Sequence, residues 1–107
     1  MTVAIKSLAD GQLPNSKGTL YTTPAATQTI INRITLVNTN SSGETVNLYF
    51  KASGGTSRRI TPKNYTLAVD ALFIMDDAIT MEAADIIEGD TTTNAKVDFV
   101  VSGMENS

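Results

Sequence analysis

The side chains that could carry chemistry in this chain are mostly carboxylates, because the sequence contains no histidine and no cysteine. Catalysis by a serine or cysteine that a histidine activates is therefore excluded, as are disulfide bonds and most zinc sites. A pair of carboxylates acting as acid and base would have to come from one acidic stretch. Its members are Asp76, Asp77, Glu82, Asp85, Glu88 and Asp90.

This acidic stretch favours a solvated edge over a catalytic pair. A glycosidase holds its two carboxylates in a cleft lined with aromatic side chains, and this chain has no tryptophan, three phenylalanines and three tyrosines. Calcium is a weaker alternative, since the acidic residues do not follow the spacing of a calcium-binding loop. We therefore expect a protein that is not an enzyme, with no catalytic residues, no cofactor and no metal.

The glycine pair in residues 53–56, Ser-Gly-Gly-Thr, could suggest a phosphate cradle. It lacks the spacing and the lysine of a phosphate-binding loop, and no helix is expected after it. We interpret it as a hairpin loop between strands at residues 46–51 and 58–61. Arg58 and Arg59 would point to opposite faces of the second strand, which indicates a strand at the edge of its sheet.

A chain of 107 residues fits one domain with one hydrophobic core. A domain of this size is only marginally stable by itself. Since disulfides are excluded, further stability would have to come from neighbouring chains. The composition therefore favours a protein that works in contact with other copies of itself.

The start of the sequence has no recognisable targeting signal. Its apolar residues are few and are interrupted by Lys6 and Ser7, which does not fit the core of a signal peptide. We therefore expect synthesis in the cytoplasm. No stretch approaches the roughly 18–20 apolar residues needed to cross a bilayer, so no membrane partner is expected.

The net charge of −3 is unevenly distributed along the chain. Residues 1–63 hold seven basic and two acidic side chains, a net charge of +5, whereas residues 64–107 hold one basic and nine acidic, a net charge of −8. The two halves either mix in the folded sheets or form a basic and an acidic face suited to contacts between copies. The basic residues are too scattered for nucleic acid to be an expected partner.

Apolar residues alternate with polar ones in most of the chain, which is typical of β-strands buried on one face. In residues 45–51 the alternation places Val46, Leu48 and Phe50 on one face. Sixteen threonines add β-branched side chains that favour strands. The expected strands cover residues 19–23, 30–38, 45–51, 58–61, 72–75, 79–81, 86–88 and 96–102.

These segments predict an all-β fold, a single antiparallel β-sandwich or jelly roll of about eight short strands. In residues 30–38 we expect a central strand, with Ile30, Ile34 and Leu36 on one face. Ile31 and Val37 would lie on the other face. Residues 64–88 also fit a helix, because several of their apolar residues would share one helical face. We favour strands there, since acidic pairs and short turns divide the segment into pieces of hairpin size.

The first 14 residues are separable from the rest in pattern, so we divide the chain into residues 1–14 and a β-sandwich domain of residues 15–107. Two interpretations of the first segment stay open, an attachment arm that adds a strand to another copy and an edge strand of its own sheet. On either interpretation it supplies candidate interface residues, to which the arginine pair is added. The full set is Val3, Ile5, Leu8, Arg58 and Arg59.

Five segments of the sequence resemble a known family. They are KGTLYTTPA at residues 17–25, ITLVNT at 34–39, VNLYFK at 46–51, SGGTSRRI at 53–60 and DIIEG at 85–89. Across nearly its whole length the chain is similar to small β-sandwich virion structural proteins of tailed bacteriophages, of the capsid decoration, cement or tail-fibre-associated type. It departs at Ala83-Ala84-Asp85, where the family pattern has Ala-Gly-Asp.

The resemblance implies a structural protein of the bacteriophage virion with no catalytic residues. We expect a capsid decoration (cement) protein, made in the host cytoplasm, that binds and stabilises the assembled shell as a homo-oligomer. A trimer is the expected size, and the partners are other copies and a phage capsid or tail protein. The alternative is a tail- or fibre-associated module, structural or carbohydrate-binding, with Tyr21, Tyr49 and Tyr65 as the tyrosines able to stack on a sugar.

Overall fold

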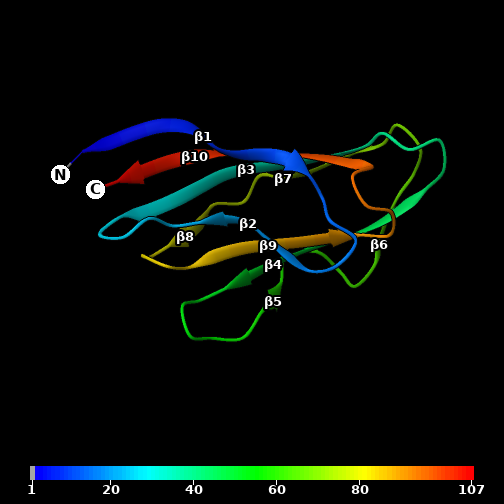
Figure 1. The fold of residues 1–107 in the computed structure, drawn as a ribbon. Coiled ribbons are helices and arrows are strands. Elements are labelled where there is room, and N and C mark those ends of the chain that lie inside the picture. Colours follow the sequence, from blue (N-terminus) through cyan, green and yellow to red (C-terminus); the bar gives the residue numbers. More distant parts are fainter. Residues whose placement is uncertain (1) are drawn as a thin grey trace.

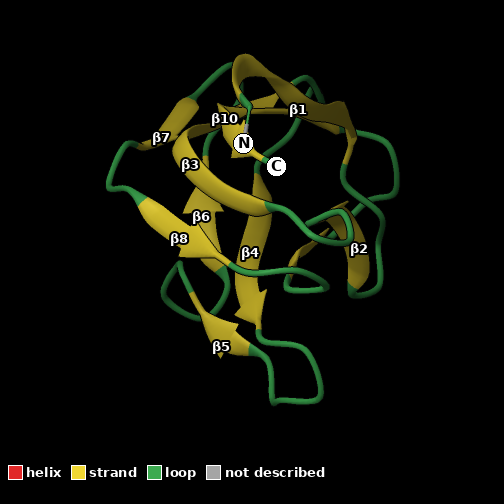
Figure 2. Cartoon of the chain, turned by 90° about the vertical axis from the view of Figure 1, so that its left-hand side faces the viewer, coloured by secondary structure: helices red, strands yellow, loops and turns green. Residues whose placement is uncertain are grey.

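The computed structural model describes residues 2–107, and all the regular structure in this range is β-strand, as Figure 2 shows. Ten strands follow one another along the chain. They are β1 (Val3–Gln12), β2 (Gly18–Thr22), β3 (Gln28–Asn38), β4 (Glu44–Lys51), β5 (Arg58–Arg59), β6 (Tyr65–Leu67), β7 (Leu72–Met75), β8 (Ile79–Met81), β9 (Ile86–Thr91) and β10 (Val97–Asn106).

The strands form two five-stranded antiparallel sheets that lie on each other as two layers (Figure 1). Sheet A has the order β1-β10-β3-β7, with β8 also pairing with β3. Sheet B has the order β2-β9-β4-β5, with β6 also pairing with β4. The predicted antiparallel β-sandwich is thus confirmed, and each of the eight expected segments contains a strand.

Two strands, β1 and β6, come in addition to the eight expected ones. The segment with the helical alternative, residues 64–88, holds β6, β7, β8 and the start of β9, so the preference for strands was right. The acidic pair Asp76-Asp77 lies between β7 and β8. It therefore separates two short strands, as expected for an acidic pair that divides the segment.

The hydrophobic core fills the space between the two sheets. Alternate residues of the central strands point into it, as Val46 and Leu48 of β4 and Val97 and Val101 of β10 do, and all four are fully buried. Burial of this apolar surface is the main force that holds the layers together. The core cluster is Leu13, Tyr21, Ile31, Ile34, Leu36, Val46, Leu48, Leu67, Met81, Ile87, Val97, Phe99 and Val101.

The two charged halves of the chain interleave in the sheets. Strand β10 of the acidic half lies between β1 and β3 of the basic half, and β9 of the acidic half lies between β2 and β4. This topology favours mixing of the halves over one basic and one acidic face. The uneven charge of the sequence is therefore no argument for a polar molecule.

Residues 3–12 form β1, the edge strand of sheet A (Figure 1). The strand pairs with β10 from Val3 to Gln12, with a bulge at Leu8. Its start lies beside the chain end, where the Ser107 amide donates to the Thr2 carbonyl at 2.8 Å. The structure thus places the segment as an edge strand; Met1 lies outside the described residues, and a docking role of the segment stays a prediction.

The turn before β9 contains Ala84, the alanine at which the sequence departs from the pattern that its resemblance implies. Ala84 has a φ of 70°, in the left-handed region that costs an alanine about 1 kcal/mol or more and costs glycine little. The turn is closed by Asp85, whose amide donates to the Glu82 carbonyl at 3.0 Å. Glycine suits this position because it has no Cβ atom to clash in the left-handed region. The alanine of this chain is therefore strained there.

We therefore expect Ala84→Gly to raise the free energy of unfolding by about 0.5–1 kcal/mol, although Ala→Gly changes usually destabilise proteins. The neighbouring Ala83→Gly is the matched control, because Ala83 does not have a positive φ, and it should lower the stability. Urea unfolding of both variants gives the two values. A loss of stability in Ala84→Gly would contradict the strain assigned to Ala84.

Candidate interaction surfaces

The acidic residues form no obvious site for chemistry. Within residues 2–107 no group of three or more histidine, cysteine, aspartate or glutamate side chains lies where it could hold a metal ion. In the same range no helix is long and apolar enough to span a membrane. Several of the acidic side chains instead accept hydrogen bonds, as Asp85 does from the Ser53 amide at 2.9 Å.

The Ser-Gly-Gly-Thr segment of residues 53–56 forms no phosphate cradle. It lies between the paired strands β4 and β5, as the hairpin interpretation predicts.

The outer face of sheet B is covered by an internal polar network. Asn47 and Tyr49 point away from the core, yet they are only 5% and 7% exposed. Asp90 accepts from the Asn47 amide at 2.8 Å and from the Tyr49 hydroxyl at 3.1 Å, and Arg59 donates to Asn47 at 2.7 Å. Lys17 lies over the Tyr49 ring, 4.4 Å from its centroid. This face satisfies its polar groups within one chain.

Burial, together with the charge of Asp90, raises the pKa of Tyr49. The tyrosine therefore stays a neutral donor to Asp90 throughout the physiological pH range. The network is thus a polar cover for sheet B that is held by hydrogen bonds within the chain.

The outer face of sheet A, by contrast, exposes several large apolar side chains among its polar ones. In register, Ile5 of β1 lies beside Met104, which lies beside Ile30 of β3, and further along Val100 and Ile74 flank Thr35. We call the exposed members of this surface the apolar face. They are Val3, Ile5, Ile30, Leu72, Ile74 and Val100, which are between 38% and 84% exposed.

The apolar face is a candidate interaction surface. Its six side chains expose on the order of 500 Å² on one side of one sheet, which is within the range of the largest patch of a monomer. The polar row of Ser7, Ser102 and Arg33 divides them into two groups. A standard interface buries about 800 Å² per partner, so this face could supply most of one. Scattered exposed apolar residues need no explanation, but six on the same sheet face do.

A hollow of about 290 Å³ lies at the end of the apolar face near the chain termini. It opens between β1, β10, β3 and β8, and it is lined by Val3, Gln28, Thr29, Ile30, Thr80, Met104 and Asn106. Ile5 lies next to it, in the same row as Met104 and Ile30, and is 84% exposed. The apolar face thus has a projecting side chain and a recess side by side.

The structure separates the candidate interface residues into two groups. Val3 and Ile5 lie on the apolar face, whereas Leu8 sits at the bulge of β1 and packs in part against the core. Arg58 and Arg59 are exposed on β5, at the edge of sheet B, as the arginine pair predicts.

Sequence reasoning missed Ile30, Leu72, Ile74 and Val100. The distribution of residues along β3 was wrong, since Ile31, Ile34 and Leu36 point inward and Ile30 points outward. A bulge causes the difference, because the register with β10 steps from Arg33 to Ile31 and leaves one residue unpaired. Strict alternation cannot anticipate such a shift.

The three tyrosines do not form a common platform for a sugar. Tyr21 and Tyr49 are each only 7% exposed, so neither ring offers its face to solvent. Tyr65 is 39% exposed and packs edge to face with Phe73, with 5.2 Å between ring centroids. The interpretation of Tyr21 and Tyr49 as ordinary strand residues therefore describes them better.

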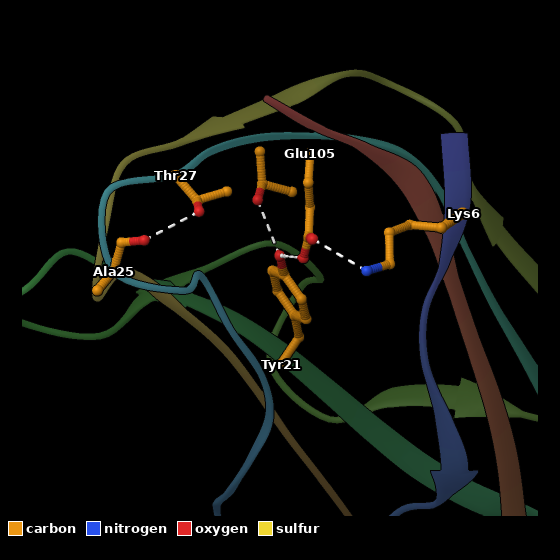
Figure 3. A network of polar contacts seen from close by, with 6 residues as sticks. Lys6, Tyr21, Ala25, Thr27 and Glu105 are labelled. Atoms are coloured by element: carbon orange, nitrogen blue, oxygen red, sulfur yellow. Dashed lines mark hydrogen bonds and ion pairs between the residues drawn. The ribbon is translucent and has the colours of Figure 1, made fainter. Parts of the chain in front are cut away.

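A second polar network closes the sandwich near the chain termini, on the inner side of the sheet that carries the hollow (Figure 3). The Tyr21 hydroxyl donates to Glu105 at 2.7 Å and lies 2.8 Å from the Thr29 hydroxyl, and Lys6 pairs with Glu105 at 3.1 Å. Hydrogen bonding from Tyr21, and then from Lys6, lowers the pKa of Glu105 in spite of its desolvation. Burial raises the pKa of Tyr21 to about 12. The network joins β2 of sheet B to β1, β3 and β10 of sheet A.

We expect Tyr21→Phe to lower the free energy of unfolding by about 1–2 kcal/mol at pH 7, because Glu105 and Thr29 each lose a partner. Glu105 has a lowered pKa in the folded state, so its contribution is complete above its unfolded pKa of about 4.3 and is lost as the pH falls below that value. The difference between the variant and the parent should therefore narrow by pH 3. Urea unfolding at both pH values measures it.

Tyr65→Phe is the control for this prediction, because Tyr65 is outside the network, and it should have a small effect at either pH. An equal loss of stability at pH 7 and pH 3 in Tyr21→Phe would contradict a role for ionised Glu105.

No protein-family profile matches the chain. A search of curated proteins finds no relative either. What the chain shares with known proteins therefore rests on its three-dimensional structure.

Solved structures share the sandwich fold. One is a chain from Bacillus endospore appendages, described as a novel family of disulfide-linked pili, with a TM-score of 0.60, 15% identity, and coverage of 99% of this chain and 88% of that one. Another belongs to the acid-stable capsid of the Helicobacter pylori bacteriophage KHP30, with a TM-score of 0.55, 10% identity, and coverage of 98% and 87%.

A third likeness is to a chain of infectious bursal disease virus, with a TM-score of 0.52 and 14% identity. It covers 97% of this chain but only 32% of the viral one. At these identities the likeness concerns the fold, an antiparallel sandwich that also occurs in capsid and pilus structures.

Proposed function

We propose that this protein is a structural subunit of a bacteriophage virion, a capsid decoration (cement) protein that binds the assembled shell and stabilises it as a homo-oligomer. The observation that carries the proposal is the contrast between the two outer faces of the sandwich. Sheet B covers itself with an internal polar network, whereas sheet A exposes six large apolar residues.

The apolar face serves contacts between copies. Exposed apolar surface of this extent is costly in water and is covered in a stable assembly. A closed, symmetric oligomer covers it on every copy at once, and a trimer is the size that we expect. The fold it shares with the KHP30 capsid chain, 87% of which this chain covers, supports a place in a virion shell.

The polar edges and loops of the subunit would contact the capsid shell. Arg58 and Arg59 are exposed at the edge of sheet B, away from the apolar face. Arg59 also donates to Asn47, so Arg58 is the residue better placed to meet an acidic surface of a capsid protein. With this division one side of the subunit contacts its copies and another contacts the particle. Synthesis in the host cytoplasm followed by assembly into the virion fits this role.

A second candidate is a structural subunit of a tail or fibre. It is favoured by the likeness to the Bacillus appendage chain, which has the higher TM-score of 0.60, and by the elongated shape of 45 × 27 × 20 Å. Without cysteine, this chain could not form the disulfide links named for that appendage.

Particle binding tests the proposal. Purified protein is mixed with phage particles that lack it and is then sedimented through a density gradient. Decoration predicts co-sedimentation with filled heads, at a saturating and fixed number of copies per particle. Binding to isolated tails alone would favour the second candidate, and no binding to heads or tails would contradict both.

A further inference from the structure

We propose that the hollow on the apolar face receives Ile5 of a neighbouring copy, so that a projecting side chain and a recess of the same surface hold two subunits together. This inference rests on the proposed self-association through sheet A and specifies its central contact. It commits to a second copy of this chain as the occupant.

The first argument is complementarity of shape. Ile5 is 84% exposed, the highest value among the large apolar side chains, and a surface residue with no partner gains most from burial elsewhere. The hollow has about 290 Å³, enough for a branched aliphatic side chain, and its wall includes Val3, Ile30 and Met104. A buried aliphatic anchor in an apolar recess is a usual centre for an interface.

The second argument is complementarity of charge on the same face. Arg33 is exposed and stands in register with Ser102, while Asp10 and Asp98 are exposed beside Val100 and Val37 further along the sheet. Among residues 2–107 the single ion pair is Lys6–Glu105, so none of these three charges has an ion-pair partner within the chain, although Gln12 donates to Asp98 at 3.1 Å. A face that carries both signs around an apolar centre suits a second copy of itself.

The third argument is area. The apolar face exposes on the order of 500 Å², which approaches the roughly 800 Å² that each partner buries in a standard interface. Ile5 and the hollow lie side by side at one end of the face, so a neighbouring copy whose Ile5 fills the hollow meets this end of sheet A with its own. Repeated around a closed ring, the same contact fills the hollow of every copy.

Disulfide trapping tests the contact directly, since the chain has no cysteine of its own. Ile5→Cys protein is mixed with Thr80→Cys protein, because Thr80 lies on the wall of the hollow. Under mild oxidation we expect a mixed dimer of the two variants. A cysteine at exposed Thr19, on β2 of sheet B, is the control, and it should trap no such dimer with Ile5→Cys.

Sedimentation of Ile5→Asp provides the second measurement, and it should show association weakened by more than about thirtyfold. Because the Ile5 side chain is so exposed, the melting temperature of the monomeric Ile5→Asp variant should stay near that of the parent monomer. If Ile5→Asp still associates while charges at Leu72 and Ile74 abolish association, the apolar face is correct and the place of Ile5 is wrong. If neither change matters, the proposed self-association fails as well.

Discussion

Replacing Gly103 by alanine should lower the free energy of unfolding by roughly 3 kcal/mol or more. Gly103 lies at the bulge where β10 passes β3, and a methyl group there would press against the Ile30 carbonyl oxygen, closer than any van der Waals contact allows. The obstacle is backbone in the centre of sheet A, which cannot move aside as a flexible side chain could. Urea unfolding measures the loss.

Gly43→Ala is the matched control for Gly103→Ala. The nearest atom to its added methyl group is the Leu67 carbonyl oxygen at 3.9 Å, an ordinary contact. We expect a change of less than about 1 kcal/mol there. Equal effects of the two substitutions would show that the close pairing of β10 and β3 at Gly103 is not required.

Placing two charges on the apolar face, in the variant Leu72→Asp with Ile74→Asp, should abolish self-association. The two side chains are 56% and 45% exposed, so the monomer should fold, whereas two carboxylates in an interface would be buried without partners. Loss of about 2 kcal/mol at each position would already weaken association by a factor of about a thousand. Sedimentation velocity over a concentration series measures it.

Val69→Asp is the matched control for this variant. Val69 is also 45% exposed, but it lies in the loop between β6 and β7. It should associate as the parent does. If all the variants stayed associated to the same extent, the apolar face would not be the contact between copies.

The fold was predictable because its main signal is local. The alternation of Val46, Leu48 and Phe50 identified β4 and its inner face, and the turn residues between the apolar segments separated the strands. The arginine pair correctly indicated the edge position of β5 for the same reason, since one residue of any neighbouring pair must face each side of a strand.

The candidate site was harder to predict because it depends on contacts between distant strands. Val3 and Ile5 were identified from their own pattern, but their neighbours Ile30, Ile74 and Val100 join them only through the pairing of β1, β10, β3 and β7. The bulge in β3 then turned Ile30 outward, against strict alternation. No pattern within a single segment contains this information.

The backbone strain at Ala84 could not be predicted in full from the local sequence. Glycine was expected at this position from a resemblance alone, and the sequence indicated only that the turn was unusual. The φ of 70° gives the reason, because an L-residue with a side chain fits this region poorly. Ala84 therefore affects the backbone conformation of the turn, and it lies apart from the apolar face.

Electron cryomicroscopy of phage particles that carry this protein tests the central claim most directly. The account predicts that the subunit forms closed oligomers on the outer surface of the shell, with sheet A buried between copies and Ile5 seated in the hollow of its neighbour. A map with the subunit absent from the head, or with sheet A facing solvent in every copy, would contradict it.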